Sequence, residues 1–145
     1  MTVTHADFRT CPATGRRTPL GAGRLIKVHA VASVVALLIG ASAAVLLVLT
    51  RWQAVHLLPA EWFYRILGVH GMSMLIFFII FFEMAVLIFA STVLLNARNS
   101  APKISWAACG LMIAGALLVE TMMWSGRADV LFTSYVPLRA DPSFY

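Results

Sequence analysis

The stretch Ile66–Leu95, ILGVHGMSMLIFFIIFFEMAVLIFASTVLL, decides the fold. Only two of its 30 residues, His70 and Glu83, carry ionisable side chains. A helix of about 20 residues crosses the roughly 30 Å hydrocarbon core of a bilayer, so this stretch can span it with residues left for tilt or extension. It lacks the alternation of apolar and polar residues that strands of a membrane barrel show. The stretch therefore predicts a transmembrane helix.

Two further apolar blocks flank this stretch, at about Val28–Leu49 and Ile104–Trp124. In the chain of 145 residues, 61% are hydrophobic and 12% are charged, and the mean hydropathy is +0.87. Soluble domains have about 45–50% apolar and about 25% charged residues, so this composition excludes a soluble enzyme domain and a disordered protein. The sequence predicts an all-α membrane protein with a polar tail at 1–27, three spans within 28–124 (about 28–49, 66–95 and 104–124), and an outer segment at 125–145.

The basic residues are divided unequally between the two sides of the predicted membrane region. One side holds seven and the other four, and cytoplasmic segments carry an excess of Lys and Arg. The N-terminus is therefore expected inside and the C-terminus outside. Although the net charge is +5, these residues form no clustered basic surface, so no nucleic-acid partner is expected. The seven are Arg9, Arg16, Arg17, Arg24, Lys27, Arg98 and Lys103; the four are Arg51, Arg65, Arg127 and Arg139.

Small residues recur at every fourth position in two of the predicted spans. Ala36, Gly40 and Ala44 form such a row in the first span, and Gly110 and Ala114 form one in the third. Rows of this kind let helix backbones approach closely in lipid. The abundance of Ala and Gly in this composition explains the rows equally well, so helix packing along them is one of two interpretations.

Three ionisable residues are predicted within the bilayer, where an unpaired charge is costly. Glu83 lies thirteen residues, about 20 Å, beyond His70 on the same helix, and the two face different neighbours, so they form no catalytic dyad. Glu83 is a candidate for a proton path or for pairing with a span outside this chain. Glu120, beside Trp124, is expected to extend into the membrane interface. No role follows for Cys11, which forms neither a CxxC pair nor a disulfide framework.

His70 admits three interpretations from its position alone. It is an axial ligand of haem iron, a hydrogen-bonding group for a neighbouring helix, or part of a proton relay. Gly71 beside it leaves room for a flat macrocycle to approach. His29 lies near the inner end of the first span, separated from His70 by most of the bilayer, and His56 lies in an outer loop where an aromatic-belt position is favoured. His56 is a geometrically possible second axial ligand, but because the aromatic-belt position is favoured, a six-coordinate haem is expected to take its second ligand from outside this chain.

Three motifs in this chain are similar to parts of one protein family. Arg51–Pro59 (RWQAVHLLP) and Phe63–Phe78 (FYRILGVHGMSMLIFF) resemble the start of haem-copper oxidase subunit I, in which a His-Gly pair opens the second span before an aliphatic and Phe-rich run. Phe132–Leu138 (FTSYVPL) is similar to the Tyr-Pro-Pro-Leu segment that the family carries on the outer face above the haems, with Val136 replacing the first Pro. The motifs occur in the family's order, from about Leu25 to Tyr145.

The resemblance implies roles for two residues. It implies that His70 is an axial ligand of the low-spin haem iron, with a haem of a or b type, and that Tyr135 lies in the outer loop near the haems. Subunit I of this family has about twelve spans, so the three spans here correspond to its first quarter. The copper site, the second haem and the second axial ligand are expected on later spans, and no catalytic residue is expected within this chain.

The function implied is a part of the haem-bearing catalytic subunit of a respiratory terminal oxidase of the cytochrome c oxidase type. Such an enzyme reduces oxygen to water with electrons from cytochrome c or quinol and couples this electron transport to proton translocation. The expected partners are the remaining spans of subunit I, subunit II and the lipid membrane. We expect a truncated or split subunit, in a bacterial or archaeal plasma membrane.

Two alternatives stay open at this point. A small non-enzymatic accessory subunit that packs on a larger membrane partner would need no continuation of the sequence and would not depend on His70 for its partner's activity. The equivalent part of a nitric oxide reductase would share the second span with its histidine, because the two groups differ around metal centres outside this chain.

Overall fold

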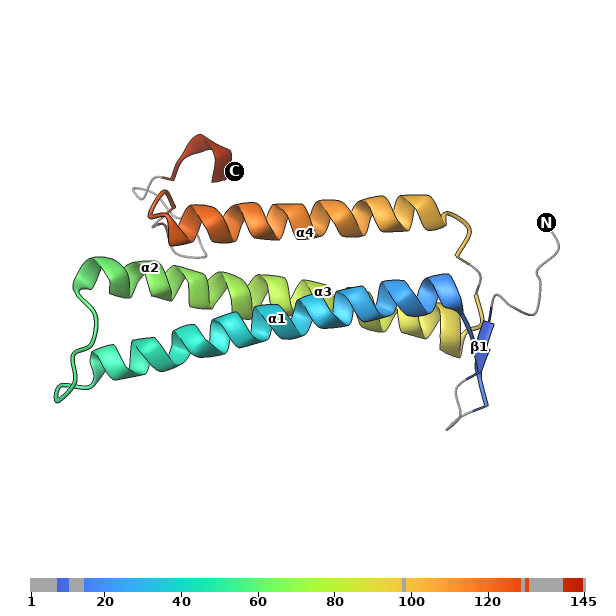
Figure 1. The fold of residues 1–145 in the computed structure, drawn as a ribbon, viewed down its shortest axis with the longest axis horizontal. Helices are drawn as coiled ribbons and strands as arrows, with labels where there is room; N and C mark the ends of the chain where they lie inside the picture. Colours follow the sequence, from blue (N-terminus) through green and yellow to red (C-terminus); the bar gives the residue numbers. More distant parts are fainter. Residues whose placement is uncertain (1–7, 11–14, 98, 129, 131–139, 145) are drawn as a thin grey trace.

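Three long helices lie side by side in the computed structural model, which describes residues 8–10, 15–97, 99–128, 130 and 140–144 (Figure 1). Among these residues, three helices are long and apolar enough to cross a membrane. The predicted all-α fold with three spans is confirmed. The first helix is α1 (Leu20–Arg51) and the last is α4 (Pro102–Trp124); the middle helix runs continuously through α2 (Ala60–Gly71), the π-helical η2 (Met72–Phe77), α3 (Phe78–Phe89) and the π-helical η3 (Ala90–Leu94).

Two short elements mark the opposite ends of the bundle (Figure 1). Strands β1 (Phe8–Thr10) and β2 (Arg17–Pro19) pair in antiparallel fashion just before α1 begins. The short 3₁₀ helix η4 (Pro142–Phe144) lies near the end of α4. The hairpin therefore stands at the end of the bundle that is predicted to face the cytoplasm, and η4 stands at the other end.

The helices extend beyond the apolar blocks of the sequence. Helix α1 begins at Leu20 rather than near Val28, because Arg and Lys are good helix formers and continue the helix outside the hydrocarbon. Helix α2 begins at Ala60, so the aromatic run Trp62–Tyr64 lies in its first turns and not in a loop. Helix α4 begins with Pro102, two residues before the predicted span, because a first helical position needs no backbone N–H donor.

One face of α1 forms the central packing surface of the bundle. Its buried residues alternate at spacings of three and four, which places them in one row along the helix. This row packs mainly against the middle helix, whereas α4 buries only Cys109 and Met123. Most other large apolar side chains are exposed, as expected where lipid surrounds the helices. The row consists of Leu25, His29, Ser33, Ala36, Gly40, Ala43, Leu47 and Thr50.

Helix α1 and the middle helix approach each other closely at Gly40. A Cβ atom built there would overlap the side chain of Met74, lying 2.8 Å from its Sδ and 3.3 Å from its backbone N. Packing along the first row of small residues is therefore confirmed at Gly40. In the third span, Gly110 and Ala114 are exposed, and a Cβ on Gly110 would meet nothing within 4 Å. That second row brings no described helices together.

We predict that Gly40→Ala destabilises the bundle by about 1–3 kcal/mol, because the added methyl group overpacks the interface with Met74. The matched control Gly110→Ala should be neutral or stabilising by up to about 1 kcal/mol, since Ala is the better helix former and the space is open. Thermal unfolding in detergent measures both, and the double variant Gly40→Ala/Met74→Ala should recover part of the loss. Equal stability of the two single variants would contradict the close contact.

Candidate functional site

His70 is held by a hydrogen bond to the backbone of α1. Its Nδ1 lies 2.8 Å from the carbonyl oxygen of Gly40. A carbonyl oxygen only accepts, so Nδ1 carries the hydrogen and Nε2 of the neutral ring keeps its lone pair. The side chain is half-buried, and its one hydrogen bond among the described residues is made by Nδ1, not by Nε2. The arrangement presents a basic nitrogen on the side of the bundle, in a fixed orientation.

The residues after His70 form a π-helical turn. Gly71, which is buried, ends α2, and the N–H of Phe78 bonds to the carbonyl of Ser73, five residues earlier. A π turn inserts one extra residue per turn and often occurs at functional sites. It rotates the residues that follow relative to those that precede, and here it lies at the level where Met74 meets Gly40.

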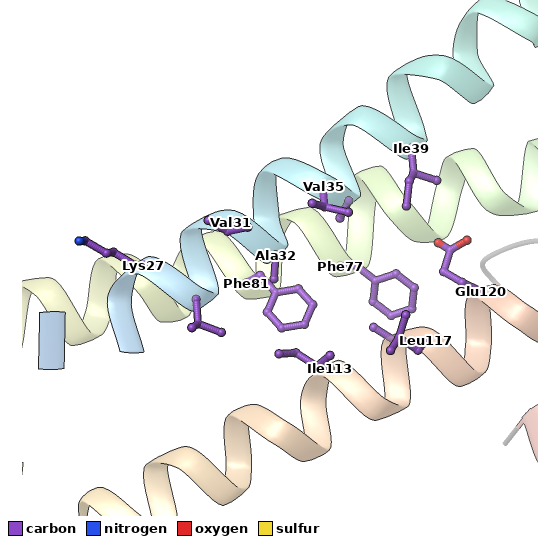
Figure 2. Close-up of a pocket in the computed structure, with 13 residues that line it drawn as sticks. Lys27, Val31, Ala32, Val35, Ile39, Phe77, Phe81, Ile113, Leu117 and Glu120 are labelled. Carbon is purple, nitrogen blue, oxygen red and sulfur yellow. The ribbon is translucent and has the colours of Figure 1, made fainter. Parts of the chain in front are cut away.

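A second polar contact ties the middle helix to α4. The hydroxyl of Ser73, which is fully buried, donates to Oε1 of Glu120 at 2.6 Å, and Nε1 of Trp124 donates to Oε2 at 3.2 Å. Glu120 also forms one end of an apolar cavity between α1, α3 and α4 (Figure 2). Instead of only extending into the interface beside Trp124, as the sequence suggested, the carboxyl group turns inward and connects two helices.

Glu83 lies on the outer surface of α3. Its side chain is exposed, and it has no hydrogen-bond or ion-pair partner among the described residues. His70 faces α1 while Glu83 faces away from the bundle, so the two form no dyad, as predicted. The proposals that Glu83 belongs to a proton path or pairs with another span stay predictions.

His29 occupies the interface of α1 and α3 toward the basic end of the bundle. The side chain is 1% exposed; Nδ1–H donates to the carbonyl of Leu25 at 2.9 Å, and the ring lies 6.1 Å from that of Phe81. His29 precedes Gly40 by eleven residues, about 16 Å along α1. Because Gly40 contacts His70, the two histidines are separated by about half of the hydrocarbon core rather than most of it. The separation still excludes ligation of one haem iron by both.

Described residues after α4 pack on the end of the bundle opposite strands β1 and β2. Ala128 and Val130 are buried in one cluster with Ile66, Val69 and Met123, so this segment packs on the helix that carries His70. The exposed His56 lies in the connection between α1 and α2. Tyr135, which is predicted to lie near the haems, and Cys11, for which no role is predicted, fall outside the described residues.

An ion pair anchors this segment. Arg127 donates to the carboxylate of Asp141, and the N–H of Asp141 donates to the carbonyl of Arg127 at 2.9 Å. Hydrogen bonds from Ser143, together with Arg127, lower the pKa of Asp141 from 3.8 to about 2. The stabilisation from ionised Asp141 is therefore fully present above pH 3.8 and is lost only as the pH falls through about 2.

Comparison with family models adds an independent result. Residues 24–145 match the model of Cytochrome C and Quinol oxidase polypeptide I. The chain belongs to this family. Polypeptide I is subunit I of the haem-copper oxidases, a helical protein with many spans that binds haem and copper. Searches of curated proteins and of solved structures found no match.

Membership of the oxidase family confirms the resemblance read from the sequence. It establishes an oxidase subunit I-like part of a multi-pass membrane protein, from a family that acts as an oxidoreductase within a membrane-embedded complex of several subunits. Within the described residues of this oxidase chain, no three His, Cys, Asp or Glu side chains are grouped as ligands of a metal ion. His70, the predicted axial ligand of haem iron, lies among the described residues.

Two contributors to the site were absent from the sequence-based candidates. Ser73 lies three residues after His70, on the same side of the helix, and that spacing was an available signal. Gly40 belonged to the small-residue row, but its carbonyl as the partner of His70 follows only from how α1 packs on the middle helix. Both residues orient the site and neither carries chemistry of its own.

We predict that Ser73→Ala destabilises the bundle by about 0.5–2 kcal/mol, because it removes a hydrogen bond between helices and leaves Oε1 of Glu120 half-buried without its donor. Ser91→Ala is the matched control on the same helix, since its hydroxyl bonds only to the carbonyl of Ile88 within that helix. Unfolding in detergent at fixed pH compares the two. A larger loss for Ser91→Ala would contradict the connecting role of Ser73.

Proposed function

We propose that this chain is part of the haem-bearing subunit of a respiratory terminal oxidase and that Nε2 of His70 is an axial ligand of the low-spin haem iron. The observation that supports the proposal is the 2.8 Å hydrogen bond from His70 to the Gly40 carbonyl. It fixes the tautomer in which Nε2 is free to bind a metal. Family membership supplies the expectation of haem.

The surroundings of His70 suit an iron ligand. Histidines that bind metals almost always donate their other ring N–H to a carboxylate, a backbone carbonyl or water, which orients the ring and raises its basicity. Here the acceptor is a carbonyl of α1, held in place because Met74 packs against Gly40 without a gap. The ring is therefore positioned before any ligand binds, so less ordering is required when the iron is bound.

The chemistry supplied by a bound low-spin haem is the acceptance and release of one electron. What this chain contributes is control of the haem environment: axial ligation, burial and hydrogen bonding set a haem's reduction potential. In the proposed complex, cytochrome c or quinol provides the electrons, oxygen is reduced to water, and protons are translocated. His29, which bonds within its own helix, is placed too far away to serve as the second axial ligand, so that ligand comes from elsewhere in the complex.

A structural role for His70 is the competing function, because the bond to Gly40 also holds two helices together without any haem. In that case the chain would be a non-enzymatic membrane subunit. The two functions make different demands on the side chain: joining the helices needs only an N–H donor, whereas ligation needs the second ring nitrogen. Asn at this position supplies a donor and no comparable ligand.

We predict that His70→Asn and His70→Ala both abolish the low-spin haem alpha band of the assembled complex, while His70→Asn retains most of the stability that His70→Ala loses. Visible spectra and thermal unfolding of the purified complex measure the two properties. The control is His56→Asn, in the exposed connection between α1 and α2, which should leave both unchanged. An unchanged alpha band in His70→Asn would refute ligation and favour the structural role.

A further inference from the structure

An apolar groove runs along the side of the bundle between α1, α3 and α4 (Figure 2). Its volume is about 430 Å³, and its wall is almost entirely apolar. Phe77 faces Leu117 of α4, and Phe81 faces Ile113 of the same helix (Figure 2). Lys27 lies at one end and Glu120 at the other. Each carboxylate oxygen of Glu120 already accepts one hydrogen bond, from Ser73 or from Trp124, so neither oxygen at this end of the groove is without a donor.

The length of the groove corresponds to one leaflet of a bilayer. From Lys27 to Ile39, both of which line it, α1 rises about 18 Å over twelve residues. One leaflet contributes half of the roughly 30 Å hydrocarbon core, about 15 Å. Ile39 also falls at the middle of the uncharged block 28–49 of α1. A single fatty acyl chain that enters at Lys27 would therefore end near the level of Ile39.

A second cavity, of about 330 Å³, opens at the Lys27 end of the groove. Three cations line it, Arg9 of β1 together with Arg24 and Lys27 of α1, and Lys27 lines both cavities. None of the three has a salt-bridge partner among the described residues, and the first turn of α1 contains no acidic residue. The positive charge at this end is thus uncompensated within the described protein and lies next to the entrance of the apolar groove.

We propose that the two cavities form one binding site for an anionic phospholipid, whose phosphate contacts Arg9, Arg24 and Lys27 and whose acyl chain lies in the groove. Charge complementarity selects an anionic headgroup, since a zwitterionic one would bring its own ammonium group to three cations. Each Lys or Arg near an anionic membrane surface contributes about 1 kcal/mol of attraction. The predicted orientation, with the N-terminus inside, assigns the site to the cytoplasmic leaflet.

The headgroup half of the site is tested by native mass spectrometry of the full chain in mixed micelles. The probes are phosphatidylglycerol and phosphatidylcholine with identical acyl chains. The unaltered chain should retain phosphatidylglycerol preferentially, and Lys27→Gln should reduce that preference about five-fold, with about 25-fold for Arg24→Gln/Lys27→Gln. The control Arg51→Gln removes the same charge at the other end of α1 and should retain the preference. Equal retention of the two lipids, or equal effects of Lys27→Gln and Arg51→Gln, would overturn the proposal.

The acyl-chain half is tested by filling the groove without changing charge. Ala116 of α4 lines it, so Ala116→Phe should lower retention of both lipids, whereas Ala107→Phe, on an exposed position of the same helix, should not. Circular dichroism and elution volume identify any variant that fails to fold, and Ala116→Leu is the milder substitute in that event. Undiminished retention in a folded groove variant, or release of an isoprenoid tail instead of phospholipid from the unaltered chain, would overturn the assignment of the groove.

Discussion

The hydrogen bond between Nδ1–H of His70 and the carbonyl of Gly40 is the interaction on which the rest of the structure depends. It joins the first two helices at Gly40, where they pack closely, and it determines which ring nitrogen is left for a metal. The bond requires a residue without Cβ on α1, because any side chain there would displace Met74 and move the middle helix away. Gly40 therefore determines both how closely the two helices pack and how the ring of His70 is oriented.

The polar contacts of the bundle share one physical cause. In hydrocarbon, a polar side chain without a partner is costly, which favours hydrogen bonds to a neighbouring helix or to the backbone of the same helix. Ser73 reaches Glu120 on α4, and Thr50 reaches the carbonyl of Leu46. Glu83 is the contrast, exposed and unpaired among the described residues.

Much of this fold could be predicted from the sequence because bilayer length imposes a simple condition on composition. The three apolar blocks followed from local patterns and correspond to the three long helices. The starts of the helices at Leu20 and Ala60 could not be predicted in this way. Charged and aromatic residues continue these helices beyond the hydrocarbon, and the apolar blocks do not mark where such extensions begin.

The contacts between helices were the least predictable part of the site. A small-residue row packs at Gly40 and fails to pack at Gly110, although the two rows look alike in sequence. The π turn η2 and the link from Ser73 to Glu120 depend on register between helices distant in sequence, which no periodicity within a single helix encodes. The one carboxyl group expected to face the interface turned inward for the same reason.

The most direct measurement of the central claim is the tautomer of His70, determined by solid-state NMR of the histidine-labelled chain in lipid bilayers without haem. His70→Asn assigns the signal. The account predicts a neutral ring with hydrogen on Nδ1 and a bare Nε2, as the bond to the Gly40 carbonyl requires. Hydrogen on Nε2 with a bare Nδ1 would contradict it, since that ring could neither donate to the carbonyl nor offer Nε2 to iron.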